Sequence, residues 1–277
     1  FASSWLLEDS NELTKPVRTL KCMTPVHSPF KTPTYMKRVV REKWDGVKGI
    51  RSQRVRWTVG GDRISCPFDV GTNTAALPTV NALFHACVSE NAHFATIDIK
   101  DFYLGAELPS PESIRVFLDH TPPPLLDELG IAPFIQYQSS RPFCFFDLSK
   151  TVPGLPQSGH FSQLELLELL QSHGYSQTST PMLFRHSHLP ISFTLVVDDF
   201  GIKYDSPSDL DHLLSCLSSK YVLKTHRTGT KYKYLGYTIG YDRAARLLTL
   251  SMPDYIPNLL AQRCPSGIRR FPPPPPP

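Results

Sequence analysis

The sequence lacks the cysteine and histidine spacings of zinc sites, and it lacks any long apolar run. Its six cysteines are scattered, with no C-x-x-C pair and no short cluster with histidine, which excludes the common zinc-binding modules. We therefore expect reduced thiols in an intracellular protein. The longest apolar runs, such as residues 193–197, fall far short of the roughly 20 residues of a membrane-spanning helix, which excludes a channel or transporter. No basic segment followed by an apolar one opens the chain, so no secretion signal is expected.

Basic charge is concentrated near the beginning of a chain whose net charge is only +4. Residues 1–66 contain 13 Lys and Arg against 6 Asp and Glu, a balance of +7, which leaves 16 against 19, or −3, in residues 67–277. Aromatic side chains (Tyr35, Trp44, Trp57) are interleaved with the basic ones, which are Lys37, Arg38, Arg41, Lys43, Lys48, Arg51, Arg54 and Arg56. This mixture suits a phosphate backbone with stacked bases. An ordinary solvated surface is the equal alternative.

Both ends of the chain are unusual. It begins with Phe1 rather than Met and stops in a run of six prolines, residues 272–277, which can pack neither as a helix nor as a central strand. We interpret both ends as cuts in a longer reading frame. Residues 1–34 are rich in Thr, Pro and Ser and show little periodicity, so we expect an irregular N-terminal segment there.

Apolar spacing predicts an α+β fold. Residues 54–59 alternate basic and apolar side chains and run into Gly60-Gly61, which predicts a hairpin continuing through residues 63–64. Helical spacing predicts core-forming helices at 79–90, 161–170 and 206–217, and Ser206-Pro207 with Asp209 is typical of a helix start. Strands are predicted at 94–99, 143–148, 193–197, 200–204, 232–241 and 247–250. An irregular insertion is expected at 109–142. This order favours an antiparallel sheet with helices on one face.

Three aspartates lie at predicted strand ends. Asp98 comes at the end of one strand, and Asp198 and Asp199 lie at the tip of the hairpin over 193–204. If these strands are neighbours, the carboxylates repel one another, which normally implies a bound metal, and Mg²⁺ prefers oxygen ligands. Two such ions can activate a hydroxyl and stabilise the leaving oxygens of a phosphoryl displacement. An Asp-Asp pair in a turn also arises by chance, because Asp is a common turn residue.

Three segments, two of which contain these acids, occur in a recognisable order. They are IDIKDFYL at 97–104, GLPQSG at 154–159 and VVDD at 196–199. Together they resemble the catalytic motifs of the reverse transcriptase of copia-like long-terminal-repeat retrotransposons, in a variant group whose acidic pair is followed by Phe-Gly. The resemblance runs from about Tyr35 to about Leu260 and covers most of the chain.

The resemblance implies roles for individual residues. The catalytic residues and metal ligands would be Asp98, Asp198 and Asp199. Four residues would bind the nucleotide: Arg56 at the triphosphate, Asp101 nearby, Tyr103 as a steric gate against a 2′-hydroxyl, and Gln157 in contact with nucleotide and template. Primer and template would contact a hairpin that contains Tyr234, Leu235 and Gly236.

The resemblance also implies an activity and a division of the chain. The activity is that of an RNA-directed DNA polymerase, a magnesium-dependent nucleotidyltransferase with two Mg²⁺ ions, for which Mn²⁺ is an alternative. The implied partners are an RNA or DNA template with primer, deoxynucleoside triphosphates and other domains of a retrotransposon polyprotein, in a cytoplasmic particle or the nucleus and without a membrane. The implied parts are fingers (35–93), palm (94–246), a stub of a largely missing thumb (247–265) and a Pro-rich disordered tail (266–277).

Two other interpretations stay open. Pro153 stands where the family usually has Tyr, and Pro257 interrupts the expected thumb helix. A truncated, catalytically inactive remnant would therefore fold and bind nucleic acid without polymerising. A palm-like sheet that serves as an RNA-binding module would carry exposed aromatics on its central strands, where this chain places acids. The histidines show no ligand spacing and are interpreted as structural or exposed.

Overall fold

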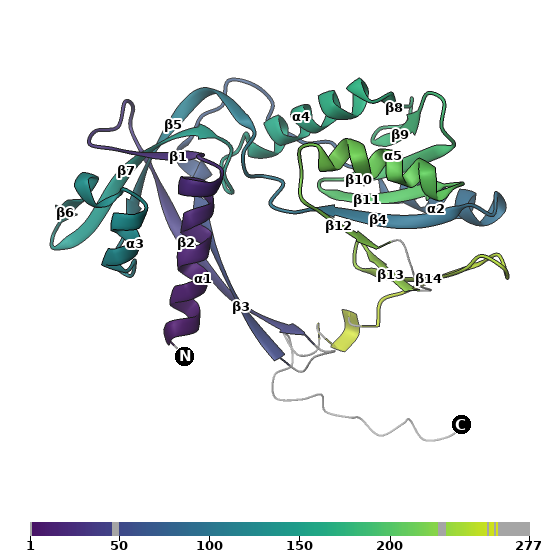
Figure 1. Ribbon diagram of the computed structural model, residues 1–277, viewed down its shortest axis with the longest axis horizontal. Coiled ribbons are helices and arrows are strands. Elements are labelled where there is room, and N and C mark those ends of the chain that lie inside the picture. The colour runs from purple at the N-terminus through teal and green to yellow at the C-terminus, as the bar shows by residue number, and fades with distance from the viewer. Residues whose placement is uncertain (1, 46–49, 227–230, 254, 258, 260–277) are drawn as a thin grey trace, which may run out of the picture. The chain divides into compact units, whose positions relative to one another are not determined.

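A computed structural model describes the chain except for residues 1, 46–49, 227–230, 254, 258 and 260–277 (Figure 1). The tail at 266–277 and part of the segment 247–265 therefore lie outside the described residues. The fold has two compact units, of which the first contains Phe1–Asn73 and Asp101–Ser172, and the second Thr74–Lys100 and His173–Pro277. Residues 101–172 thus fold in the same unit as the N-terminal residues, and the division into fingers (35–93) and palm (94–246) stays a prediction.

The first unit is built on a six-stranded sheet. Its strand order is β1-β7-β5-β2-β3, and β6 pairs with β7. The strands are β1 (Met23–Val26), β2 (Thr34–Asp45), β3 (Ile50–Val59), β5 (Glu107–Phe117), β6 (Gln136–Gln138) and β7 (Arg141–Lys150). The helical segments are α1 (Ala2–Thr14), the π-helix η1 (Lys15–Thr19), the 3-10 turns η2 (Gly61–Arg63) and η3 (Ala132–Phe134), α3 (Pro123–Glu128) and α4 (Ser158–Ser172).

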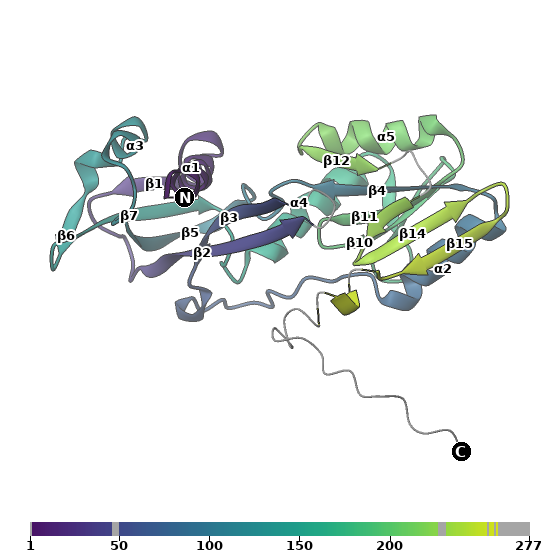
Figure 2. The same ribbon diagram turned by 90° about the horizontal axis from the view of Figure 1, so that it is seen from below.

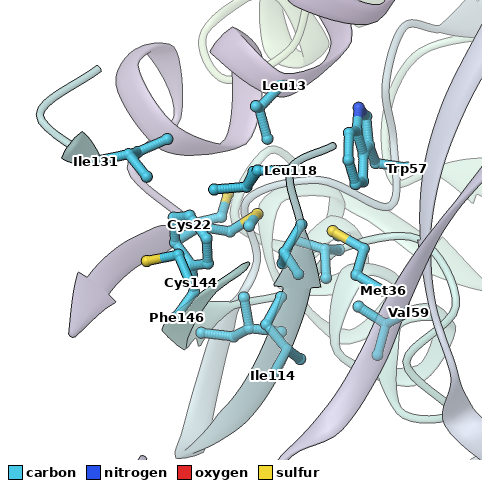
Figure 3. Close-up of a cluster of buried hydrophobic side chains, with 14 of the residues drawn as sticks. Leu13, Cys22, Met36, Trp57, Val59, Ile114, Leu118, Ile131, Cys144 and Phe146 are labelled. Carbon is cyan, nitrogen blue, oxygen red and sulfur yellow. The ribbon is translucent and has the colours of Figure 1, made fainter. Parts of the chain in front are cut away.

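The N-terminal segment is ordered, contrary to the prediction for residues 1–34. Leu13 of α1 is 1% exposed and joins the main core of this unit, together with Cys22 and Trp57 (Figure 3). Asp9 of the same helix is buried and accepts a hydrogen bond from Nε of Arg38 at 3.0 Å. Tertiary burial of one helix face therefore outweighs a local sequence that has little periodicity of its own.

The segment 109–142 is also regular, although the sequence predicts an irregular insertion. Its first part continues β5, which pairs with β7 in antiparallel and with β2 in parallel orientation. The register of β5 against β7 shifts between Glu107 and Glu112, as at a β-bulge. The prolines within β5, Pro109 and Pro111, hid this strand, because Pro lowers strand propensity, but both lie within the register shift, and Pro is tolerated at bulges.

The hairpin predicted at Gly60-Gly61 is wrong. The partner of β3 is the preceding strand β2, with Val39 opposite Arg56 and Arg41 opposite Arg54. Neither glycine has a positive φ. A Cβ on Gly60 would lie 2.3 Å from the ring of Tyr35, so this glycine permits a close approach and does not form a turn.

The second unit contains a six-stranded sheet and a three-stranded sheet, all with antiparallel pairs. The large sheet has the order β12-β4-β11-β10-β9-β8 and the small one β13-β14-β15. The strands are β4 (His93–Ile99), β8 (Tyr175–Gln177), β9 (Leu183–His186), β10 (Ile191–Val196), β11 (Asp199–Tyr204), β12 (Leu223–His226), β13 (Lys231–Tyr234), β14 (Tyr237–Asp242) and β15 (Leu247–Ser251). Its helices are α2 (Leu77–Ser89) and α5 (Pro207–Ser218).

Both faces of the large sheet are covered. On the face that α5 covers, aromatic contacts join Phe184, Phe193 and Phe200. His212 of α5 contacts Tyr175 on the same face. On the other face lie α2 and the small sheet, as Figure 2 shows. The predicted α+β class with an antiparallel sheet is confirmed. The prediction placed helices on one face of the sheet only, whereas the structure covers both faces.

The predicted start of α5 is confirmed, whereas the predicted core face of α4 differs from the structure. The capping box at Ser206 and Asp209 is present, and the amide of Ser206 donates to Asp209 Oδ2 at 2.8 Å. In α4 the buried residues include Leu166 and Leu170, whereas Leu164 is 42% exposed. The prediction that Leu164 belongs to the core is therefore wrong, because the buried stripe of this helix runs through Ser162, Gln163, Leu166 and Leu170.

Candidate active site

Register places two of the three predicted acids directly opposite each other. In the pairing of β11 with β4, Asp199 is the partner of Asp98. Directly opposed residues of an antiparallel pair point to the same face, with Cβ atoms about 5 Å apart, and like charges there are destabilising. The third acid, Asp198, lies with Val197 in the two-residue loop between β10 and β11, and its carbonyl oxygen accepts from the amide of Ile99 at 3.2 Å. The predicted convergence of the three aspartates is thus observed.

The loop that carries Asp198 is strained. Val197, the residue before it, has φ of 62°, and a β-branched residue in the left-handed region is a genuine outlier that costs about 1–3 kcal/mol. The sequence analysis placed the turn at Asp198-Asp199. The structure shifts it by one residue, so that Asp199 begins β11 and is held in the sheet.

Electrostatics at this end of the sheet disfavour the ionised form of Asp199. The pKa of its carboxyl is raised from 3.8 to about 6, first because burial removes water and then because of the charges of Asp198 and Asp98. The shift shows that the three carboxylates lie close enough to repel one another.

A cation that the sequence analysis missed lies beside Asp98 on the next strand of the sheet. Lys224 of β12 is the register partner of Asp98, and its Nζ lies 3.2 Å from Asp98 Oδ2. Both side chains are well exposed, 61% for Lys224 and 41% for Asp98, so the pair contributes at most about 1 kcal/mol. Residues 222–225, Val-Leu-Lys-Thr, do not alternate apolar and polar side chains, so the sequence carries no strand signal that predicts β12 or its neighbour.

The donor set fits a hard divalent cation in its chemistry. Three carboxylates offer only oxygen, which Mg²⁺ prefers, and the charges of Asp198 and Asp98 add to burial in raising the pKa of Asp199. In the part of the chain that the structure describes, no three His, Cys, Asp or Glu side chains are placed so that they could hold a metal ion as they stand. The side chains would therefore have to rotate for all three to bind one ion.

The hairpin with Tyr234, Leu235 and Gly236 is formed as a two-residue turn between β13 and β14. Leu235 and Gly236 both have positive φ, 50° and 83°, as in a type I′ turn. Tyr234 itself is 3% exposed. Its ring lies against Gly201, where a Cβ would come within 2.8 Å, and its hydroxyl lies 3.1 Å from Thr194 Oγ1. The side chain of Tyr234 is therefore a core element, and only the turn itself offers a surface to a ligand.

Four predicted nucleotide-binding residues belong to the first unit. Gln157 is 5% exposed, and its amide lies between two side chains. Its Nε2 donates to Glu112 Oε1, and its Oε1 accepts from the thiol of Cys66, both at 3.4 Å. Glu112 in turn forms an ion pair of 2.7 Å with Lys31. An ionised carboxylate only accepts hydrogen bonds, which fixes the orientation of the Gln157 amide.

Tyr103 lies near the motif that contains Gln157, and Asp101 lies near the N-terminal helices. A Cβ on Gly159, two residues after Gln157, would lie 3.5 Å from Cε1 of Tyr103, so the predicted steric gate and the Gln motif are neighbours. Asp101 has φ of 55°, and its Oδ2 lies 3.7 Å from Nζ of Lys15. Asp101 is exposed, whereas Tyr103 is half-buried.

Arg56 lies on an exposed basic face. In β3, Val55, Trp57 and Val59 are buried while Arg54 and Arg56 are exposed, as the predicted alternation requires. Register adds residues of β2 to this face, which we call the basic face of β2 and β3 and which comprises Lys37, Arg41, Arg54 and Arg56. A hollow of about 270 Å³ lies over it. Arg38 points to the other face and stacks on Trp57 at 4.5 Å.

The chain was compared with known proteins. No family model and no curated protein matches it. Among solved structures it is similar to the foamy viral protease-reverse transcriptase dRH with double-stranded DNA (TM-score 0.48, 12% identity, 89% of this chain, 35% of that chain). It is also similar to the native protease-reverse transcriptase of prototype foamy virus (0.41, 14%, 78%, 23%) and to the foamy viral enzyme with an RNA/DNA hybrid (0.44, 10%, 84%, 26%).

These similarities are distant. The chain spans about a third or less of the length of each of the three proteins. All three scores lie below 0.5 and all identities below 25%, so these similarities assign no function to this chain. The described cysteines, Cys22, Cys66, Cys87, Cys144 and Cys216, are free thiols, and no described helix is long and apolar enough to cross a membrane.

Proposed function

We propose that this chain is the polymerase part of a reverse transcriptase of a copia-like retrotransposon, which transfers nucleotides to a primer 3′-hydroxyl on an RNA template. One observation carries the proposal: Asp98 faces Asp199 across two adjacent strands, with Asp198 in the strained loop beside them. A directly opposed carboxylate pair destabilises a sheet, and phosphoryl transfer at two metal ions is a chemistry that requires such a pair.

Asp98, Asp198 and Asp199 would hold two Mg²⁺ ions. When bound, the ions would activate the primer hydroxyl and stabilise the charge on the leaving oxygens. The protein itself would bind and orient the substrates. The guanidinium of Arg56 would bind the triphosphate, because a planar fork of donors matches phosphate oxygens.

Other residues of the first unit would select the nucleotide. The ring of Tyr103, beside Gly159, would exclude a 2′-hydroxyl by its bulk, and Asp101 would lie near the triphosphate. Gln157 would contact nucleotide and template through an amide whose orientation Glu112 fixes. The turn at Leu235 and Gly236 would contact the primer, together with the backbone of Tyr234.

A second candidate function is nucleic-acid binding without polymerisation. Two observations favour it: the exposed basic face of β2 and β3 carries Lys37, Arg41, Arg54 and Arg56, and the carboxylate of Asp98 is already paired with Lys224. A row of exposed cations neutralises phosphates and gives a salt-dependent affinity that does not need the acidic site.

Primer extension separates the two functions. The assay uses an RNA template, a DNA primer, all four deoxynucleoside triphosphates and Mg²⁺. The proposed polymerase extends the primer, and the double variant Asp198→Asn/Asp199→Asn loses the activity by several orders of magnitude. The variant Asp205→Asn, which changes an exposed aspartate just after β11, is the matched control and keeps it.

The opposite result is also informative. Wild-type extension that survives in the double variant would refute the acidic site. If neither protein extends a primer but both bind template-primer, and the binding falls with salt and with Arg54→Met/Arg56→Met, the second function holds instead.

A further inference from the structure

A cavity of about 390 Å³ lies in the second unit, away from the aspartates. One wall is α2, with Ala82 and Ala86, and another is the loop with Leu189 and Pro190. Its floor is formed by β9, β10 and β11. A volume of this size is typical of binding sites for small molecules, and such sites are usually lined by apolar walls with a few polar groups, as this cavity is.

Three polar residues of the floor lie in one row across the sheet. Ser192 of β10 is the register partner of Arg185 on β9 and of Lys203 on β11. Direct partners share a face, so a hydroxyl is flanked by two cations. Ser192 is 7% exposed and lines the cavity. A serine hydroxyl can donate a hydrogen bond to an anionic group that lies between the two cations.

The charges around the cavity leave one positive charge uncompensated. Lys203, whose side chain is only 13% exposed, pairs with Glu90, which is 56% exposed. Arg185 is exposed and forms no ion pair with any residue that the structure describes. With one carboxylate and two cations, the lining has a net charge of +1. The row of Arg185, Ser192 and Lys203 therefore suits a single anionic group.

The loop that forms one wall is held in place by His186. Its Nδ1 accepts from the backbone amides of His188 at 3.1 Å and Leu189 at 2.9 Å. An imidazole nitrogen that accepts two hydrogen bonds carries no proton, so His186 is neutral in this arrangement and adds no charge. The wall is thus ordered before a ligand binds, which lowers the entropic cost of binding.

We propose that this cavity binds a small organic anion that carries one negative charge on an apolar body. The anionic group lies between Arg185 and Lys203 and accepts from the Ser192 hydroxyl. The apolar body contacts Ala82 and Ala86 of α2 and the Leu189-Pro190 loop. This site is separate from the acidic site and does not depend on polymerase activity.

The test compares a charged and an uncharged probe on the whole chain. The charged probe is 8-anilinonaphthalene-1-sulfonate, which has one sulfonate on an aromatic body, and the uncharged one is N-phenyl-1-naphthylamine. Affinities are measured by fluorescence titration in EDTA. The variant Arg185→Met/Lys203→Met lowers the affinity for the sulfonate probe by about tenfold or more, because charge-assisted hydrogen bonds are lost. It changes the affinity for the amine probe by less than about twofold.

Two further variants complete the test. Lys220→Met removes an exposed cation outside the cavity and leaves both affinities unchanged. Ala82→Phe fills the cavity from α2 without changing its charge and abolishes the binding of both probes. The proposal is overturned if the sulfonate binds equally well to the charge variant, if both probes weaken together in that variant, or if Ala82→Phe, folded by its circular dichroism spectrum, still binds them.

Discussion

Replacing Asp199 by Asn is expected to stabilise the protein in the absence of metal. The pKa of Asp199 is raised from 3.8 to about 6 by burial and by the charges of Asp198 and Asp98. The difference corresponds to an upper limit of about 3 kcal/mol in the free energy of unfolding. Asp199 is half-buried, and solvent screening lowers the expected gain to about 1–2 kcal/mol. Asn has nearly the same shape, so packing is kept.

The sign of the pH dependence follows from linkage. The pKa of Asp199 is higher in the folded than in the unfolded chain, so between about pH 4 and pH 6 the folded state binds the proton more tightly. The wild-type protein therefore loses stability as the pH rises through this window, and the whole penalty is present above it. Asp199→Asn removes this contribution, so the two proteins differ little at pH 4 and most at pH 7.

Urea denaturation in EDTA, followed by circular dichroism at pH 4, 5, 6 and 7, measures the difference. Asp205→Asn is the control, and because this aspartate is exposed, we expect a change within about 0.5 kcal/mol at every pH. A variant at position 199 that is less stable than wild type at pH 7, or a difference that is constant with pH, would refute the argument from charge repulsion.

Three further substitutions test the packing around the two units. Val197→Gly should stabilise the chain by about 1 kcal/mol, measured by urea denaturation, because glycine adopts φ of 62° without strain; Val197→Ala should gain less. Gly201→Ala should cost about 1–3 kcal/mol, since its Cβ would meet the buried ring of Tyr234, and Tyr234→Leu in the same chain should reduce that cost. Arg38→Met should cost about 3 kcal/mol at pH 7 by leaving Asp9 buried without a partner; an equal loss in Arg38→Met/Asp9→Asn would show that the charge is not the cause.

The second unit was largely predictable from the sequence, because its signals are local. Alternation and turn residues gave the hairpin at 193–204, and Ser206-Pro207 with Asp209 gave the start of α5. The convergence of the aspartates followed from one further assumption, that β4 and β11 are neighbours, and the register confirms it.

The first unit was not predictable in the same way, because its order depends on long-range pairing. β5 pairs with β2 and β7, which are far from it in the chain, and its prolines hide it from a local analysis. The glycines at 60–61 have the composition of a turn, although Gly60 admits the ring of Tyr35 and Gly61 lies close to the carbonyl oxygen of Gly154. Gln157 was predicted to meet a ligand, but no spacing in the sequence indicates that Glu112 and Cys66 hold its amide.

Three unfavourable features meet at one end of one sheet. Asp98 lies opposite Asp199, the carboxyl of Asp199 is kept from its ordinary pKa, and Val197 has a left-handed backbone. A few residues further along the same strands, Thr194, Gly201 and Tyr234 fit together without strain. Since local choices normally agree with the fold, a concentration of unfavourable ones at three acids is better explained by chemistry at that site than by folding. The cost at Asp199 is the one that a bound cation would relieve, so Mg²⁺ should stabilise the wild-type protein more than Asp199→Asn.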